Sequence, residues 1–309
     1  MRALDLVRFL STSATTRTAP DTPTALRARL AGGAARALEA GRKVRTEVPR
    51  ELRERTTEAS LAAFLTAYVD DRESGATEGG RHALRYALHH PSATLGAVAA
   101  VLRLPVAPAA LGDGPAGEIL RSTLLARHLG GLTVASTGVA VLDVPADGGD
   151  YVLGATRQTL RRKVRAAQKK GVAFRFVEDP AERAALLERA NAAEQAHADA
   201  QYRVDTPDNS DLLLHDLWLV ATDADGEAIM LSVTPVDGEW ALLRYFRTLG
   251  ASPAHSDARY LLMPALVSAL AERGVRHLVD STPPPQLSNG LRHFQRMVGY
   301  RYARVRVTR

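Results

Sequence analysis

The second half of the sequence holds side chains whose chemistry suits proton transfer. Asp280 lies at the carboxyl end of the predicted strand "VRHLVDS", where the sites of α/β proteins gather. Its carboxylate could hold or deprotonate an amine, or it could only shape the loop beside "TPPP". His255 lies in a predicted loop, and the ordinary pKa of histidine suits a general base. A lone loop histidine is also commonly a plain surface residue.

Two further positions could take part in the same chemistry. Arg244 and Tyr245 are neighbours in the predicted strand "ALLRYFRTL". Their side chains therefore point to opposite faces of a sheet, and one of the two faces a cleft there. Tyr300 could protonate a leaving group or pack beneath the last predicted strand.

A basic run stands out in "TRQTLRRKVRAAQKKGVAFRFVED". Seven basic residues and no acid fall between positions 157 and 170. On a helix, residues four apart share one face, and contacts with phosphates would make binding depend steeply on salt. The candidate RNA-binding residues are Arg157, Arg161, Arg162, Arg165 and Lys169. The alternative is a solvated helix face, and no aromatic residue interleaves with the basic ones.

Composition narrows the possible classes of protein. The chain has 309 residues, of which 46% are apolar, so it can bury a core. It has no cysteine, which excludes disulfides, thiolate zinc sites and cysteine nucleophiles and favours the cytoplasm. No metal site is expected, because the histidine pairs lack partners at ligand spacing. No signal peptide or membrane span is expected, because apolar runs are short or interrupted.

The predicted elements change character near residue 130. From about residue 20 to 128 the pattern is helical, with helices within 22–44 and 57–74 and a pair divided at His90-Pro91. "LGAVAAVLRLPVAPAAL" indicates soluble helix and loop. "GLTVAST" and "GVAVLDVP" indicate strands. After the basic helix, the order is strand, helix, three strands with turns at Asp225-Gly226 and Asp237-Gly238, helix, strand, helix, strand.

That order resembles the GNAT acyltransferases. The end, "HLVDSTPPPQLSNGLRHFQRMVGYRYARVRV", is similar to the close of Fem-type aminoacyl-tRNA-dependent transferases and GNAT-like proteins. These have an acid at a strand end, a loop, then "GL", "F" and "GY". The matching residues are Asp280, Gly290, Leu291, Phe294, Gly299 and Tyr300. The basic helix and the strand after it are similar to the entry of the same group, so the resemblance covers about residues 151–309.

The resemblance implies an α/β fold of the α+β kind, with a GNAT-like mixed sheet flanked by helices. We expect this domain over 131–309, with a basic entry helix over 157–170. Residues 1–130 would form a mostly helical region, either a degenerate second lobe or an acceptor-binding part. The implied donor site lies where the middle strands splay, and its expected residues are Arg244, Arg247, Gly250, Ser256 and Tyr300. The candidate catalytic residues are Asp280, Tyr245 and His255.

The expected function is transfer of an aminoacyl group from aminoacyl-tRNA to an amine of a small molecule, peptide or carrier-bound intermediate. "RTLGASPAHSD" lacks the compact glycine loop of a coenzyme A site, and glycine is what lets a backbone approach a pyrophosphate. No cofactor is then needed. One alternative is an acyl-coenzyme A-dependent N-acyltransferase, with the thioester as donor. Another is a non-catalytic RNA- or partner-binding module. No membrane partner is expected, and the oligomeric state stays open.

Overall fold

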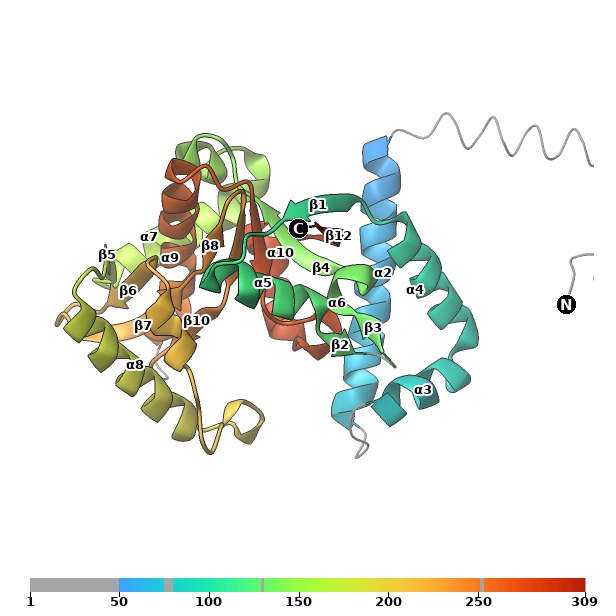
Figure 1. Ribbon diagram of the computed structural model, residues 1–309, viewed down its shortest axis with the longest axis horizontal. Helices are drawn as coiled ribbons and strands as arrows, with labels where there is room; N and C mark the ends of the chain where they lie inside the picture. Colours follow the sequence, from blue (N-terminus) through green and yellow to red (C-terminus); the bar gives the residue numbers. More distant parts are fainter. Residues whose placement is uncertain (1–49, 75–79, 129–130, 251–252, 309) are drawn as a thin grey trace, which may run out of the picture. The chain divides into compact units, whose positions relative to one another are not determined.

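The computed structural model describes residues 50–74, 80–128, 131–250 and 253–308 (Figure 1). The chain divides into two compact units, Met1–Arg53 and Glu54–Arg309. The helix predicted within 22–44 lies outside the described residues. The second unit contains all the residues discussed below.

The first described helices match the predicted pattern. They are α2 (Arg50–Ser74), α3 (Gly80–His89) and α4 (Pro91–Arg103). Pro91 is the first residue of α4, where its missing N–H costs nothing, and His90 separates the two helices. Leu61 and Leu65 of α2 pack against Ala100 of α4. After a short strand comes α5 (Pro115–Leu125), which lies within the region predicted to be helical.

A mixed six-stranded sheet forms the centre of the second unit, in the order β1-β12-β4-β11-β9-β8. Its strands are β1 (Val106–Ala110), β4 (Val139–Asp143), β8 (Val236–Asp237), β9 (Trp240–Leu243), β11 (His277–Asp280) and β12 (Arg301–Thr308). β1 runs parallel to β12, and β11 runs parallel to β9. The other pairs in this sheet are antiparallel.

A second, antiparallel sheet has the order β10-β7-β6-β5. Its strands are β5 (Ala173–Phe176), β6 (Trp218–Thr222), β7 (Ala228–Val233) and β10 (Tyr245–Thr248). A small ribbon of β2 (Arg127–His128) and β3 (Leu132–Thr133) lies apart from both sheets.

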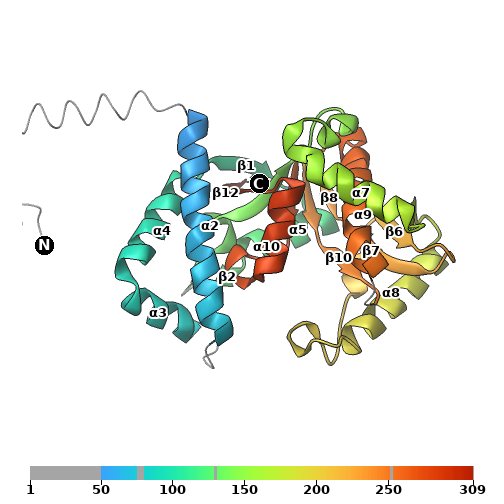
Figure 2. The same cartoon turned by 180° about the vertical axis from the view of Figure 1, so that it is seen from behind.

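Helices cover both faces of each sheet (Figures 1 and 2). One shared core joins both sheets to α7 (Gln158–Lys169), α9 (Pro253–Glu272) and α10 (Asn289–Val298). On the far face of the four-stranded sheet lies α8 (Pro180–Gln195), which the Asp179 carboxylate caps. On the far face of the six-stranded sheet lie α5 and α6 (Val134–Thr137).

Five short 3-10 helices complete the described secondary structure. They are η1 (Gly148–Val152), η2 (Ala155–Arg157), η3 (Ala200–Tyr202), η4 (Ser210–Leu214) and η5 (Pro284–Gln286). The α/β fold class with mixed sheets and a helical start is confirmed.

Two local predictions are wrong. "GLTVAST" is only a two-residue strand followed by α6, because Val134 and Ala135 turn into the core beside α5. "VAPAA", predicted as loop, is the edge strand β1. Pro108 fits there because an edge strand leaves one row of backbone groups without a ladder partner.

Candidate functional site

The chain changes sheets within the segment predicted as one strand, 241–249. β9 pairs with β11, while β10 pairs with β7, and Arg244 lies between the two strands. The last pair shared by β9 and β11 is Leu243 opposite Asp280. β10, two residues further on, belongs to the four-stranded sheet. Asp280 therefore lies opposite the last residue of β9 before the chain crosses to the other sheet, where the two sheets part.

Asp280 is half-buried and is held by two hydrogen bonds. Its carboxylate accepts one from the backbone N–H of Thr282 and one from the side-chain amide of Gln295, each at 2.8 Å. Burial raises the pKa of this carboxyl, and the two donors only partly offset that rise. A carboxylate with a raised pKa is a better proton acceptor than an ordinary one.

Tyr300 is buried close to Asp280. Among the described residues its hydroxyl has no hydrogen-bond partner. Burial raises its pKa, and the nearby Asp280 carboxylate raises it further. The neighbouring Tyr151 differs, because its hydroxyl donates to the Val298 carbonyl at 2.6 Å. Two of the predicted residues, Asp280 and Tyr300, are therefore brought together.

Aromatic rings from three elements meet where the sheets part. Phe294 of α10 lies 6.0 Å from Phe246 of β10 and 5.4 Å from Tyr260 of α9, measured between ring centroids. Phe294 is next in the chain to Gln295, which holds Asp280. These rings belong to the apolar core that the two sheets share.

Tyr245 lies on the other face of the four-stranded sheet. It is buried in the core beneath α8, and burial followed by the Glu194 carboxylate raises its pKa. The exposed Arg247 forms an ion pair with Glu194 at 3.3 Å. Arg244 binds Asp211 through two hydrogen bonds of 2.9 Å. The contacts of Tyr245, Arg247 and Arg244 are thus with α8 and η4 rather than with Asp280.

The start of α9 brings a third set of predicted residues together. His255 is half-buried, and its ring lies so close to Gly250 that an added Cβ would be 2.7 Å from its Nε2. Burial lowers the pKa of His255, which the Asp223 carboxylate partly offsets. Ser256 is exposed.

An acidic side chain occupies this first part of α9. Asp257 is buried, and its carboxylate lies 2.5 Å from the ammonium of Lys170 and 3.6 Å from that of Lys163. Both lysines belong to the predicted basic segment. The N-terminal end of a helix favours an anion, and here the Asp257 carboxylate is that anion.

Two of the candidate RNA-binding residues, Arg157 at the end of η2 and Arg161 in α7, contact the protein itself. Arg157 lies 4.9 Å from the centre of the Tyr151 ring and close against Gly299. Arg161 donates to the carbonyls of Val152 and Gly154. The remaining candidates are exposed: Arg162, Arg165 and Lys169.

A shallow groove of about 430 Å³ runs between α7 and α9. Arg161 and Arg165 line one side, Leu261 and Pro264 form part of its apolar floor, and Phe174 of β5 stands at its edge. Phe174 is 42% exposed, which leaves an aromatic face open beside two arginines. Such a combination suits stacking of a nucleobase next to phosphates.

Several residues of these groups escaped the sequence prediction. They are Tyr151, Lys163, Lys170, Phe174, Asp257 and Gln295. The "GL…F" stretch contains Gln295 next to Phe294, so it offered a local signal for that residue. The other contacts join segments far apart in the sequence, and no spacing rule reports them.

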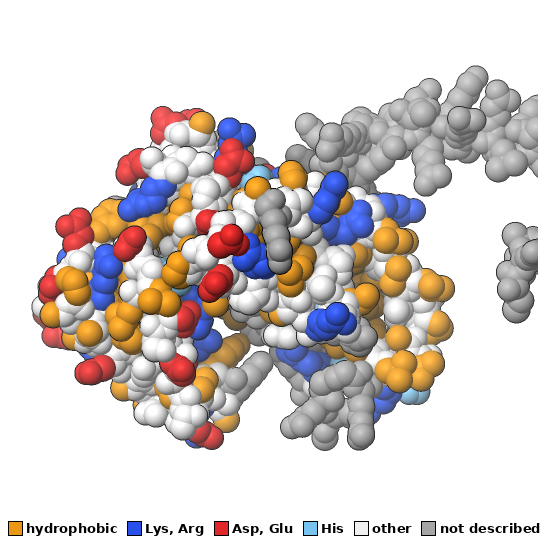
Figure 3. Space-filling model, in the orientation of Figure 1, with side chains coloured by type: hydrophobic (Ala, Val, Ile, Leu, Met, Phe, Trp, Pro, Cys, Tyr) orange, Lys and Arg blue, Asp and Glu red, His pale blue; other side chains and the backbone are white. Residues whose placement is uncertain are grey.

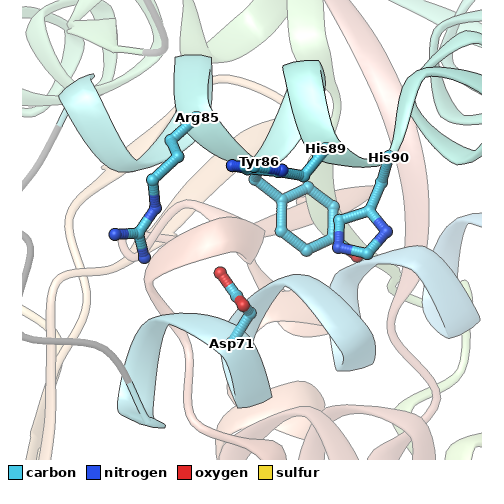
Figure 4. A pocket seen from close by; sticks show the side chains of 5 residues that line it. All are labelled: Asp71, Arg85, Tyr86, His89 and His90. Carbon is cyan, nitrogen blue, oxygen red and sulfur yellow. The ribbon is translucent and has the colours of Figure 1, made fainter.

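A second hollow, of about 470 Å³, lies between α2 and α3 (Figure 4). Asp71 and Arg85 point toward one another from the two helices, and Tyr86, His89 and His90 complete the lining. Beside it the buried His82 pairs with Asp71 at 2.8 Å. None of the predicted site residues lines this hollow. Within the described ranges, no group of three or more His, Cys, Asp or Glu side chains could hold a metal ion.

Comparisons with known proteins give limited matches. No protein-family model matches the chain. No curated protein matches it either. Among solved structures, L-PGS from Bacillus licheniformis aligns over 53% of this chain and 57% of its own, with 18% identity and a TM-score of 0.41. The C-terminal domain of a putative lysylphosphatidylglycerol synthetase from Agrobacterium fabrum aligns over 54% and 57%, with 16% identity and a TM-score of 0.42. The chain thus spans little more than half the length of either structure.

Proposed function

We propose that this protein is a cytoplasmic acyltransferase that moves an aminoacyl group from aminoacyl-tRNA to an amine. The observation that carries the proposal is the change of sheet at Arg244, which leaves Asp280 at the parting of the sheets. A carboxyl whose pKa burial has raised is suited to accept a proton there.

The proposed roles follow from the contacts. The acceptor nitrogen attacks the ester carbonyl of the aminoacyl group and loses a proton to Asp280. The ester C–O bond breaks, and the ribose oxygen of the tRNA leaves with a proton from Tyr300. Asp280 then returns the proton that it accepted to Tyr300, with which it interacts. Gln295 orients Asp280. The products are an amide and free tRNA.

The choice of donor rests on charge at the first part of α9. The Asp257 carboxylate already occupies the cations of Lys163 and Lys170. A coenzyme A pyrophosphate placed there would meet a carboxylate and would have to displace it. By contrast, the groove between α7 and α9 offers Arg165 and the exposed ring of Phe174. Those groups suit the unpaired 3′ end of a tRNA.

The test is a transfer assay with the full chain. Mixed aminoacyl-tRNAs carrying labelled amino acids, or labelled acetyl-coenzyme A, are incubated with a panel of amines and amine-bearing peptides. Phosphatidylglycerol is added as a further acceptor, since that lipid occurs in the name of the matched Agrobacterium fabrum protein. We expect label to move from tRNA, and RNase treatment of the donor to abolish the transfer.

Two variants sharpen the assay. Asp280→Asn removes the proposed base, and Asp225→Asn changes an exposed aspartate in a hairpin turn as a matched control. Transfer that survives RNase, or that requires acetyl-coenzyme A, would contradict the proposed donor. RNA binding without transfer from either donor would instead favour a non-catalytic binding module.

A further inference from the structure

The outer sides of α3 and α4 expose five large apolar side chains. Their exposed fractions lie between 51% and 73%, high values for residues of this size. We call this set the α3–α4 apolar face, and its members are Leu84, Leu88, Leu95, Val98 and Leu102. Single exposed leucines are ordinary, but several along two consecutive helices point to a site of interaction.

The spacing shows that the exposure follows from the helices themselves. Leu84 and Leu88 are four residues apart on α3, and Leu95, Val98 and Leu102 are three and four apart on α4, so each group forms one stripe. The opposite side of α4 is already packed, because Ala100 contacts the leucines of α2. α4 therefore has two apolar sides, and one of them is exposed among the residues that the structure describes. Figure 3 shows hydrophobic side chains following one another along α4.

The surroundings of this face are basic. No Asp or Glu occurs in the sequence from residue 79 to 112, while the exposed Arg103 ends α4. Arg304 donates to the Leu102 carbonyl at 3.0 Å, at the end of the stripe. Arg306 lies two residues further along β12 and is exposed. Asp71 of α2 pairs with His82 and lines the hollow between α2 and α3.

This charge pattern distinguishes between the possible occupants. A second copy of the chain docked on the same face would bring like charges together, because the same patch meets itself in a two-fold interface. An anionic lipid surface provides the opposite charge for the arginines and an apolar layer for the leucines. We propose that the α3–α4 apolar face docks this protein on anionic membranes.

The geometry fits a helix that lies on a bilayer. In the described ranges no helix is long and apolar enough to cross a membrane. α4 has 13 residues, so it is about 20 Å long, well short of the roughly 30 Å hydrocarbon layer. Leucines on one side of such a helix reach the boundary between headgroups and acyl chains. Docking does not depend on the proposed transfer reaction.

The experiment is co-sedimentation of the full chain with lipid vesicles. One vesicle type is phosphatidylcholine alone, and the other contains about one third phosphatidylglycerol. We expect binding to the anionic vesicles, weakened by salt, and little binding to the neutral ones. The variant Leu95→Gln/Leu102→Gln should bind the anionic vesicles at least about tenfold more weakly. Arg103→Gln/Arg306→Gln should lose about fivefold or more.

The matched control is Leu213→Gln/Leu214→Gln. These two leucines in η4 are 45% and 64% exposed, so the same chemical change is made far from α4 in the sequence. Unchanged circular dichroism and thermal unfolding show that each variant is folded. Equal binding by wild type and Leu95→Gln/Leu102→Gln, or no binding to anionic vesicles, overturns the proposal. A dimer of the wild type in ultracentrifugation that Leu95→Gln/Leu102→Gln dissolves would also overturn it, by assigning the face to a second copy.

Discussion

The side-chain amide of Gln295 donates a hydrogen bond to the Asp280 carboxylate at 2.8 Å, across the end of β11. Gln295 is buried on α10, so its amide has little freedom to turn away. This contact fixes the orientation of a carboxyl whose pKa burial has raised. It also ties α10 to the strand that ends where the two sheets part.

Replacing Asp280 should separate catalysis from folding. Asp280→Asn keeps the size of the side chain but cannot accept a proton, so the rate of transfer should fall by roughly a hundredfold or more. Gln295→Ala leaves the base in place but unoriented, and a smaller loss of rate is expected. Rates are measured in single-turnover assays, with Asp225→Asn as the control. Full activity of Asp280→Asn would exclude it as the base.

The pH dependence of stability should also reveal Asp280. Because its folded pKa lies above the ordinary 3.8, the folded state holds this proton more tightly than the unfolded state. The stabilisation is complete below 3.8 and is lost as pH rises through the raised pKa. The unfolding free energy of wild type minus that of Asp280→Asn should therefore fall as pH rises from about 4 through the raised pKa. Transfer should rise over the same window. A difference that grows with pH would mean that the pKa is lowered.

Two buried tyrosines provide a matched pair. Among described residues the Tyr300 hydroxyl has no partner, so Tyr300→Phe should change stability by less than about 0.5 kcal/mol and yet slow transfer. The Tyr151 hydroxyl donates to the Val298 carbonyl, so Tyr151→Phe should cost about 1 kcal/mol and leave transfer intact. Denaturant unfolding and the transfer assay measure both. The reverse pattern would make Tyr300 structural.

The donor can be tested through Asp257. Wild type should not bind coenzyme A in calorimetry, because Asp257 holds both Lys163 and Lys170. Asp257→Asn frees the two ammonium groups at the first part of α9 and should bring weak coenzyme A binding. The expected loss of stability is only about 1 kcal/mol, since the lysines are 40% and 43% exposed. Micromolar binding by the wild type would point to the acyl-coenzyme A alternative.

Charge reversal on α7 tests the contact with tRNA. Arg165→Glu should lower the tRNA-dependent rate about tenfold and flatten its dependence on salt, because a phosphate contact is lost. Arg165 is the better position to change than Arg161, which also braces the backbone of η1. Arg127→Glu on β2 is the control, as Arg127 is also exposed. Equal rates for both variants would show that the basic residues of α7 form a solvated helix face and do not contact tRNA.

Local sequence signals predicted much of this fold. The glycine turns and the helical periodicities placed α8, β6, β7 and α10 correctly, since each depends on neighbours in the chain. The break at Arg244 carried no such signal. The strands on either side of Arg244 have the pattern of one extended segment. Only their pairing partners, β11 and β7, decide which sheet each strand joins.

The candidate site was less predictable for the same reason. Their spacing of four residues suggested that Arg157 and Arg161 share an outward face of a helix. In the structure both side chains contact η1. The pairing of Lys170 with Asp257 joins residues 87 positions apart, which no local pattern encodes. Whether Asp280, Tyr245 and His255 are catalytic stays a prediction.

The most direct test of the central claim is single-turnover transfer of a labelled amino acid from tRNA to an amine acceptor by wild type and Asp280→Asn. The account predicts transfer by the wild type that RNase abolishes, and a loss of roughly a hundredfold or more in a folded Asp280→Asn. Equal rates for the two proteins, or transfer that persists after RNase, would contradict it.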